Sequence, residues 1–313
     1  MTSFASVRYV VVLGAAGFIG RHAARLFSLR GYTVLGLGHG SWEKGEWESW
    51  GLSEWQSADI TESSLDLFVG SRPINAIVHC AGSGAVSFSY RNPFEDFSRA
   101  VYSTACILEW IRRRGGSNCR FVFLSSAAVY GDQGPINLNE DSPVSPISPY
   151  GHHKHAAEIL CKSYARSFNI PISIVRFFSV YGEGLQKQLL WDALNKFSKG
   201  ESTFWGSGEE LRDWIHVQDA AELIVASAKA VQDDFVIYNG GAHVASIRDI
   251  LIELARVYKS NLPIIFNGVI DAGNPYRLCA DTSLAVRTLG WSPTMTLESG
   301  ILAYSNWYKS FSA

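Results

Sequence analysis

Short runs of β-branched and other apolar residues alternate with segments of helical periodicity over the first 178 residues of the chain. The apolar runs are "VRYVVVLG", "YTVLGL", "INAIVHCAG", "CRFVFLSS" and "ISIVRFFSV", and the helical pattern "FIGRHAARLFSLRG" lies between the first two. Such alternation is typical of a parallel sheet with helices on both faces, so we expect an α/β fold with a doubly wound parallel sheet of the Rossmann type. Each run ends at Gly, Ser or Ala. The carboxyl ends of the strands in such a sheet are where ligands bind.

The pattern loosens beyond residue 178. A polar segment, "GEGLQKQLLWDALNKFSKGES", is followed by two helical stretches, "HVQDAAELIVASAKAV" and "IRDILIELARVYKS". We therefore predict a Rossmann domain over residues 1–178, to which residues 212–240 also contribute. Residues 179–313 are predicted to form mainly a smaller, substrate-binding region.

The segment "WEKGEWESWGLSEW" carries four tryptophans among four glutamates and one lysine. Proteins that bind single-stranded nucleic acid combine aromatic rings with a basic groove, whereas the charges beside these rings are acidic. We therefore predict that the rings cover an edge of the sheet.

Charge and cysteine content narrow the class of protein further. The formal net charge of −2 gives no broad reason to bind nucleic acid or an anionic membrane surface. The five cysteines are scattered and lack CxxC spacing, so they suggest neither a disulfide framework nor a zinc site. The first apolar run is too short for the core of a signal peptide, and no stretch reaches membrane-spanning length. We expect a soluble, cytoplasmic protein.

A glycine-rich turn follows the first predicted strand and opens the first predicted helix. Gly14, Gly17 and Gly20 stand in "GAAGFIG", the spacing of a dinucleotide-binding turn. Glycine allows the tight turn and the close approach of the backbone to a pyrophosphate, and the helix N-terminus attracts its negative charge. This turn makes residues 1–178 a candidate NAD(P)-binding domain.

The end of the second predicted strand bears on the choice between NAD and NADP. An Asp or Glu there commonly holds the adenosine ribose, but this chain has "GHGS", residues 38–41. The missing acid removes a barrier to a 2′-phosphate, which His39 or Lys44 could contact. NADP is favoured by this argument, and both NAD and NADP are kept as candidate cofactors.

The segment "SPYGHHKHAAE" places Tyr150 and Lys154 four residues apart, so on a helix they share one face. His152, His153 and His155 are rotated away from Tyr150 by roughly 200°, 300° and 140°, so we expect no metal site. A phenol with a reference pKa of about 10 needs help to act as a base at neutral pH. A lysine ammonium group and an oxidised nicotinamide would both favour the phenolate.

These motifs resemble the extended short-chain dehydrogenase/reductase superfamily, specifically the NAD-dependent nucleotide-sugar epimerase/dehydratase family. The resemblance covers nearly the whole chain, because the following motifs occur in the family's order and spacing: "GAAGFIG", "ADIT", "VHCAG", "FLSSAAVYG", "SPYGHHK", "VRFFSVYGEG", "GSGEELRDWIHVQDAAE" and "LGWSPTMTLESGI". It implies an enzyme that acts on a nucleotide-diphosphate sugar, of the kind used in polysaccharide biosynthesis.

The resemblance also implies residue roles. Ser126 hydrogen-bonds the reacting sugar oxygen, Tyr150 is the acid/base, and Lys154 orients the cofactor and lowers the pKa of Tyr150. Arg212 contacts the substrate diphosphate, which suits its planar, bidentate guanidinium group. The implied cofactor-binding residues are Gly14, Gly17, Phe18, Ile19, Gly20, His39, Asp59, Ile60, Ala81, Tyr150 and Lys154. Asp59 and Ile60 among them flank the adenine.

Several positions depart from the family pattern. Family members that dehydrate the sugar carry an acid after the serine of the "VYG" motif, where this chain has Ala127 and Ala128. Because alanine carries no titratable proton, a 4,6-dehydratase is disfavoured. Epimerisation through a transient keto intermediate, or reduction of a keto sugar, remains.

Other departures concern the substrate pocket. Ser179 and Ala100 stand where relatives commonly have Asn, and Asp271 stands where a second phosphate-binding arginine is expected, with Arg277 as a candidate substitute. The candidate substrate-binding residues are Ser83, Ser126, Ser179, Arg212 and Arg277.

The sequence therefore favours an NAD(P)-dependent nucleotide-sugar epimerase, acting at C4. The alternative is an NAD(P)H-dependent reductase of nucleotide-activated 4-keto-6-deoxysugars. A dehydrogenase on a lactone, steroid or phenolic alcohol and a non-catalytic cofactor-binding protein rank lower. The resemblance also implies a homodimer built from the helices near residues 94–114 and 150–168.

Overall fold

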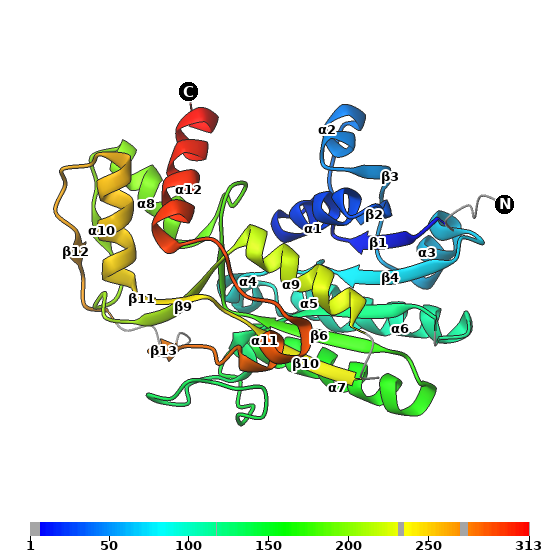
Figure 1. Cartoon of the computed structure of the whole chain (residues 1–313). Helices are drawn as coiled ribbons and strands as arrows, with labels where there is room; N and C mark the ends of the chain where they lie inside the picture. The colour runs from blue at the N-terminus through cyan, green and yellow to red at the C-terminus, as the bar shows by residue number, and fades with distance from the viewer. Residues whose placement is uncertain (1–6, 117, 231–234, 270–274, 313) are drawn as a thin grey trace.

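A parallel sheet of seven strands runs through the larger part of the molecule (Figure 1). The computed structural model describes residues 7–116, 118–230, 235–269 and 275–312. The strands lie in the order β10-β6-β5-β4-β1-β2-β3, and every neighbouring pair is parallel. Their bounds are β1 Tyr9–Leu13, β2 Thr33–Gly38, β3 Leu52–Ser57, β4 Ile74–His79, β5 Arg120–Ser126, β6 Ile172–Phe177 and β10 Phe235–Gly240. The predicted doubly wound α/β sheet is confirmed.

Helices cover both faces of this sheet, so its strands are buried on both sides. Val10 and Val12 of β1 pack toward α1 (Phe18–Leu29) and α9 (Val217–Lys229). Val11 and Leu13 pack toward the opposite layer, which contains α3 (Glu62–Val69), α6 (Ser103–Arg113) and α7 (Pro149–Phe168). All four side chains are fully buried. This is why the strands appear in the sequence as continuous apolar runs.

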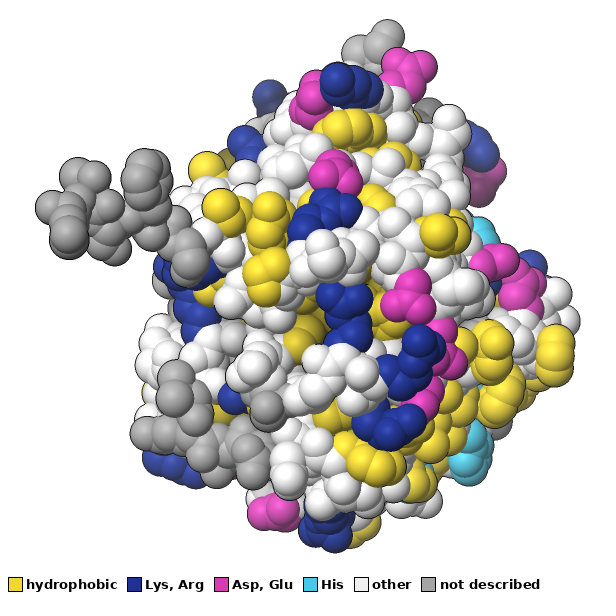
Figure 2. All heavy atoms as spheres, turned by 90° about the vertical axis from the view of Figure 1, so that its right-hand side faces the viewer, with side chains coloured by type: hydrophobic (Ala, Val, Ile, Leu, Met, Phe, Trp, Pro, Cys, Tyr) yellow, Lys and Arg dark blue, Asp and Glu magenta, His cyan; other side chains and the backbone are white. Residues whose placement is uncertain are grey.

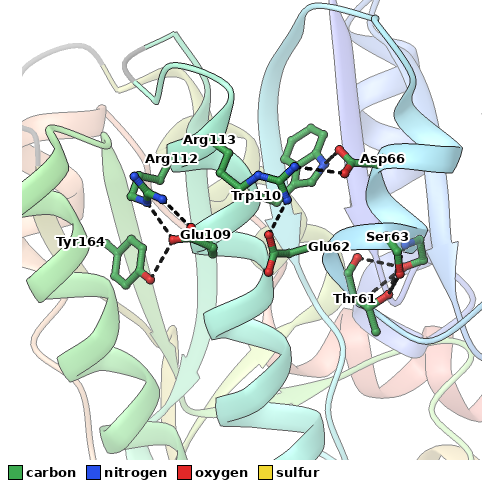
Figure 3. Close-up of polar contacts among 10 residues, drawn as sticks. Thr61, Glu62, Ser63, Asp66, Glu109, Trp110, Arg112, Arg113 and Tyr164 are labelled. Atoms are coloured by element: carbon green, nitrogen blue, oxygen red, sulfur yellow. Dashed lines mark hydrogen bonds and ion pairs between the residues drawn. The ribbon is translucent and has the colours of Figure 1, made fainter.

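Polar contacts at the surface hold α6 between α3 and α7 (Figure 3). Arg113 of α6 lies 2.7 Å from Glu62 of α3, and the indole of Trp110 donates to Asp66 at 2.8 Å. On the other side, the Tyr164 hydroxyl of α7 donates to Glu109 at 3.3 Å. Exposed pairs of this kind stabilise a fold by only about 0–1 kcal/mol each. On the face shown in Figure 2, basic and acidic side chains are interspersed.

The tryptophan-rich segment forms the edge of the sheet. It contains α2 (Lys44–Ser49) and leads into the outermost strand, β3. The rings of Trp42 and Trp55 meet edge to face, with their centroids 5.4 Å apart, and Trp47 and Trp50 pack against the same apolar cluster. The prediction that these rings cover a sheet edge is confirmed.

Short helices follow two strands at the carboxyl edge of the sheet. After β4 come α4 (Val86–Arg91), α5 (Pro93–Phe97) and the π-helix η1 (Ser98–Tyr102), which leads into α6. After β5 comes the 3₁₀-helix η2 (Ala127–Val129). Single π-turns inside helices occur frequently at functional sites.

A smaller region lies beside this carboxyl edge (Figure 1). Its four-stranded sheet contains β7 (Ser179–Tyr181), β9 (Leu211–His216), β11 (His243–Ser246) and β13 (Arg277–Leu278), while β8 (Thr203–Phe204) pairs with β12 (Ile265–Phe266). A separate apolar cluster joins it to α8 (Gln188–Ser198), α10 (Ile247–Tyr258) and α12 (Leu297–Ser312). Between β9 and β11 the chain returns to the large sheet through α9 and β10, and α11 (Ser283–Leu289) contacts both.

Two further observations concern the described residues alone. None of their helices combines the length and apolar character needed to cross a bilayer. Among them, no group of three or more His, Cys, Asp or Glu side chains is arranged to hold a metal ion. The five cysteines are free thiols.

Candidate active site

A cavity of about 1190 Å³ opens at the carboxyl edge of the large sheet. Segments that follow β1, β4, β5 and β6 form one wall, including Phe18, Ala81, Ser126 and Phe177. The smaller region forms the other wall, with side chains such as Arg212. The cavity therefore lies where ligands of doubly wound proteins bind, and both regions contribute to it.

The glycine-rich turn forms one end of this cavity. Gly14 has a φ of +79°, and a Cβ atom on it would lie 2.7 Å from the backbone nitrogen of Ala81. A Cβ atom on Gly20 would lie 2.2 Å from the carbonyl oxygen of Gly14. Both positions therefore require glycine. Gly17, Phe18 and Ile19 line the cavity at the N-terminus of α1, where Gly17 is the N-cap and no side chain caps the helix.

At the end of β2, His39 is paired with an acid from the neighbouring strand connection. Its Nε2 lies 2.7 Å from Asp59 Oδ1, and both side chains are exposed. Ile60 beside it is buried. The missing acid at the end of β2 therefore favours NADP less than the sequence suggests. The Asp59 carboxylate lies at the same place and pairs with the His39 imidazole.

Three predicted catalytic residues line the cavity together: Ser126, Tyr150 and Lys154. Ser126 ends β5, and the other two lie in the first turns of α7. The Ser148 hydroxyl caps this helix by accepting from the Gly151 backbone, which is a favourable N-terminus. A Cβ atom on Gly151 would lie 2.5 Å from the carbonyl oxygen of Ala128, so glycine lets α7 pack closely against the segment after β5.

Burial dominates the electrostatics of this group. It lowers the pKa of Lys154 to about 8 and raises the pKa of Tyr150 to about 12, while the hydrogen bond between Tyr150 and Ser126 opposes the second shift. The Lys154 ammonium group donates to the Leu124 carbonyl oxygen at 2.7 Å and lies 6.0 Å from the centroid of the Tyr150 ring. The chain's own residues therefore leave the pKa of Tyr150 raised and not lowered, because burial of the phenol is the largest effect on it.

A buried ion pair anchors the middle of α7 to the sheet. Arg176 of β6 donates through Nε and Nη2 to the two carboxylate oxygens of Glu158, at 3.0 and 2.7 Å. The Ser125 hydroxyl donates to the same carboxylate at 2.5 Å. Because every one of these groups is buried and hydrogen-bonded, the helix that carries Tyr150 and Lys154 has a fixed position.

Three of the five predicted substrate residues line the cavity, the third being Ser126, and two do not. Ser179 and the buried Arg212 line it, and Arg212 Nη1 donates to the Leu211 carbonyl oxygen at 2.7 Å. Ser83 and Arg277 do not line the cavity, and their substrate role stays a prediction. The Ser83 hydroxyl is directed to the buried Asp96, and the Arg277 guanidinium group donates to Asn137 at 2.8 Å. Asp271 lies outside the described residues.

Sequence reasoning missed three residues that the smaller region brings to the cavity. Lys187 donates to the Ser83 carbonyl oxygen at 2.9 Å, and Gln188 donates to the Gly84 carbonyl oxygen at 3.1 Å, so both bridge the two walls. Trp205 lies at the rim with 71% of its surface exposed. Lys187 and Gln188 stand at the start of α8 and Trp205 directly follows β8, where no hydrophobic period predicts a neighbour in space.

A histidine cluster joins the smaller region to α1 beside the glycine turn. His216 Nε2 lies 3.0 Å from Glu183 Oε2, and His22 Nε2 lies 2.9 Å from the Glu183 carbonyl oxygen. Burial lowers the pKa of His22 to about 4. The cluster fixes the loop at Glu183 over the first turns of α1.

Comparison with known proteins identifies the family. A model of the NAD-dependent epimerase/dehydratase family matches residues 10–241. The chain belongs to this family. It is 30% identical to a putative UDP-glucose 4-epimerase of Methanocaldococcus jannaschii over 96% of this chain and 98% of that protein. The structure of UDP-glucuronic acid 4-epimerase from Bacillus cereus, in complex with UDP-glucuronic acid and NAD, is 28% identical and superimposes with a TM-score of 0.84 over 97% of this chain and 99% of that one.

The family also includes enzymes of the other reaction type. The chain is 26% identical to a dTDP-glucose 4,6-dehydratase of Escherichia coli over 96% of this chain and 92% of that protein. Similarity alone thus does not separate epimerase from dehydratase, and the argument from Ala127 and Ala128 stays a prediction.

The family's cofactor, NAD, fits the residues at the glycine end of the cavity. Gly14 and Gly20 leave room for a close backbone approach, and the uncapped N-terminus of α1 offers backbone N–H groups for a pyrophosphate. Lys154 and Tyr150 lie in the same cavity, where the nicotinamide end would be held. The recognition of the superfamily from the sequence is confirmed.

Proposed function

We propose that the protein is an NAD-dependent epimerase of nucleotide sugars, acting at C4 through a transient keto intermediate. One observation carries this proposal: Ser126, Tyr150 and Lys154 meet in a single cavity that has the glycine turn among its walls and the Arg212 guanidinium group among its lining side chains. The cavity thus combines a cofactor cradle, an acid/base and a cation suited to phosphate.

In this mechanism the side chains of the protein transfer the proton and position the sugar and the cofactor. Ser126 and Tyr150 hydrogen-bond the C4 oxygen of the sugar, and Tyr150 accepts its proton and later returns it. NAD, when bound, would supply the hydride acceptor and donor for C4. The phenol, whose pKa burial raises to about 12, needs a nearby positive charge to act as a base at neutral pH. Lys154 holds the cofactor ribose and supplies part of that charge.

The cations of the cavity support a diphosphate-linked substrate. Arg212 is buried at the wall, where a guanidinium group can form two parallel hydrogen bonds to phosphate. Lys187 has an ammonium group on the same wall. It can serve as the second phosphate-binding cation, the role that the sequence assigned to Arg277. The exposed ring of Trp205 at the rim is suited to stacking on a nucleobase.

The acidic side chains that line the cavity support the prediction that the protein is not a 4,6-dehydratase. Ala127 and Ala128 carry no titratable proton, and the three carboxylates among the described residues that line the cavity, Asp132, Asp192 and Glu210, are engaged elsewhere. Asp192 pairs with Lys196 at 2.8 Å, Glu210 accepts from the Ser207 and Gly208 backbones, and Asp132 accepts from the Gly134 backbone. None is a free base beside Ser126.

The second candidate is a reductase of 4-keto sugars that uses exchangeable NADPH, because residues 38–41, "GHGS", contain no acid of their own, although Asp59 lies beside His39. Purified protein is incubated with UDP-glucose, UDP-galactose, UDP-glucuronic acid and dTDP-glucose without added cofactor, and the products are separated by anion exchange. Conversion to the C4 epimer supports the epimerase. Strict dependence on added NADPH with a 4-keto sugar supports the reductase and rejects the epimerase.

We also propose that the chain divides into a cofactor region and a substrate region as predicted, and that it forms a homodimer through the α5–α7 face. Phe94 of α5, Tyr102 of η1 and Ile159 of α7 expose 81%, 56% and 56% of their surface, which is costly for large apolar side chains on a free face. Light scattering should give twice the mass of one chain, and Phe94→Asp with Ile159→Asp should give the mass of one. A wild-type protein with the mass of one chain would reject the dimer.

A further inference from the structure

A buried carboxylate lies behind the proposed site, and the hydride chemistry does not use it. Asp96 of α5 exposes only 1% of its surface. Its Oδ1 accepts from the Ser83 hydroxyl at 2.5 Å, and its Oδ2 lies 2.7 Å from Nδ1 of His153. Burying a carboxylate is costly unless it is hydrogen-bonded, and both oxygens of Asp96 have hydrogen-bond partners here. The carboxylate therefore joins three segments: the loop after β4, α5 and α7.

Each partner of Asp96 belongs to the construction of the cavity. Ser83 stands between Gly82 and Gly84, which line the cavity, and its carbonyl oxygen accepts from Lys187 of the opposite wall. His153 stands between Tyr150 and Lys154 on the first turns of α7. Its ring packs edge to face on Phe97, with the centroids 5.8 Å apart. Fixing Ser83 and His153 thus fixes the cavity wall relative to the helix that carries the acid/base.

The charge of Asp96 acts on both Tyr150 and Lys154. Burial raises the pKa of Tyr150, and Asp96 raises it further. Burial lowers the pKa of Lys154, and Asp96 opposes that shift more strongly than the other groups that face the ammonium group and raise its pKa, Cys80, Glu158 and Cys161. His79 of β4 also lies close enough for Lys154 to affect its pKa.

The other charged side chains around Asp96 are engaged away from it. Arg91, at the end of the neighbouring α4, donates to the Ser87 carbonyl oxygen at 3.4 Å. Arg99 of η1 pairs with Glu95. Among the described residues, His153, Tyr150 and Lys154 are titratable groups that interact with the Asp96 carboxylate, and Ser83 is its hydroxyl donor.

We propose that Asp96 is a positioning residue of this site: it fixes the Ser83 wall and His153 in place and puts a negative charge beside the turns of α7 that carry Tyr150 and Lys154. The proposal rests on the proposed function for the reaction that the site catalyses. The effect of the Asp96 charge on the titration of Lys154 can be tested without that reaction. Asp96→Asn is the direct test, because it keeps the shape and one acceptor and removes the charge.

The first measurement does not depend on turnover. Lysine labelled with ¹³C at Cε is incorporated, the Lys154 signal is assigned with Lys154→Arg, and its titration is followed by NMR. Removal of a nearby opposite charge should lower the titration midpoint of Lys154 by about one pH unit in Asp96→Asn. Asp96→Glu, which restores the charge, should return the midpoint toward the wild-type value. An unchanged midpoint in a folded Asp96→Asn protein would overturn the proposal.

The second measurement is the pH profile of kcat/KM with the best nucleotide sugar. Loss of the negative charge lowers the pKa of both Tyr150 and Lys154, so both limbs of the profile should move to lower pH in Asp96→Asn. Ser83→Ala keeps the charge and should lower kcat/KM without moving the limbs, and Glu222→Gln, in a surface pair with Arg30, should change nothing. If kcat/KM of Asp96→Asn falls equally at every pH and neither limb of the profile moves, Asp96 has only a structural role and the proposal is wrong.

The two measurements separate this inference from the proposed function. A wild-type protein that converts no nucleotide sugar would refute the function, and the Lys154 titration would still decide the role of Asp96. Should Asp96→Asn fail to fold, His153→Gln removes the imidazole but leaves the carboxylate charge. It should then leave the Lys154 midpoint near its wild-type value, and a fall as large as one pH unit would contradict the proposal.

Discussion

The Tyr150 hydroxyl performs the proton step of the proposed reaction. Its neighbours, Ser126 and Lys154, position and tune it, but neither replaces a phenol. Tyr150→Phe should therefore lower kcat by about 10²–10⁴-fold, the range for loss of a general acid/base, and should leave substrate binding nearly unchanged. Rates and binding constants for the nucleotide sugar check this. Tyr164→Phe, which removes a surface hydroxyl near Glu109, is the matched control and should keep full activity.

Burial of the Lys154 ammonium group lowers the free energy of unfolding of the protein. Its pKa in the folded protein, about 8, lies below the value of 10.5 for an unperturbed lysine. Between those values the unfolded chain binds more protons than the folded one, so stability should rise with pH from about 8 to 10.5. Below pH 8 the full penalty, about 3 kcal/mol, opposes folding.

Lys154→Met should therefore stabilise the protein at pH 7 by about 1–2 kcal/mol, because the lost hydrogen bond to Leu124 offsets part of the gain. The gain should vanish near pH 10.5, and activity should be lost. Urea unfolding at pH 7 and at pH 10 measures both. A variant that is less stable than wild type at pH 7 would show that burial of this ammonium group costs little.

At the scale of elements, the β1–α1 turn is the part that least tolerates an added methyl group. Gly20→Ala places a Cβ atom 2.2 Å from the Gly14 carbonyl oxygen, so the turn must open. We expect a loss of about 2 kcal/mol or more in the free energy of unfolding, and NAD should no longer raise the melting temperature. Gly45→Ala in the exposed α2 is the control. Its Cβ atom meets nothing within 4 Å, and the change should stabilise the helix by up to about 1 kcal/mol.

The elements differ in how well the sequence predicts them. The inner strands are apolar on both faces, so their sequences read as continuous hydrophobic runs and were placed correctly. The edge strand β3, "LSEWQS", is half exposed and was missed. The strands of the smaller region are two to six residues long, too short to show a period.

The residues of the site also differ in how well the sequence predicts them. Gly14, Tyr150 and Lys154 stand in local motifs whose spacing follows from a turn or a helix, and these could be predicted. The pairing of Asp96 with His153 joins residues 57 positions apart, and Lys187 reaches Ser83 across 104. Such contacts depend on how α5, α7 and the smaller region pack, which no local pattern encodes. The contact of Arg277 with Asn137 joins residues 140 positions apart and was not predicted for the same reason.

At the scale of the whole molecule, the smaller region completes the cavity by bringing Arg212 opposite the large sheet. Arg212→Gln should raise KM for a nucleotide sugar by about 10- to 100-fold, as expected for a lost charge-assisted hydrogen bond, with a smaller effect on kcat. Arg277→Gln should leave KM unchanged, because its guanidinium group is bound to Asn137 outside the cavity. Steady-state kinetics of the two variants checks both. The opposite result would restore the substrate role predicted for Arg277.

The central claim is that hydride leaves C4 of a nucleotide sugar and returns to the same carbon within one cavity. Its most direct measurement is an incubation of the protein with UDP-glucose deuterated at C4, with no added reduced cofactor, followed by NMR and mass spectrometry of the nucleotide sugars. The account predicts a mixture of C4 epimers that both keep the deuterium at C4. Loss of deuterium from C4, or accumulation of NADH in step with product, would contradict it.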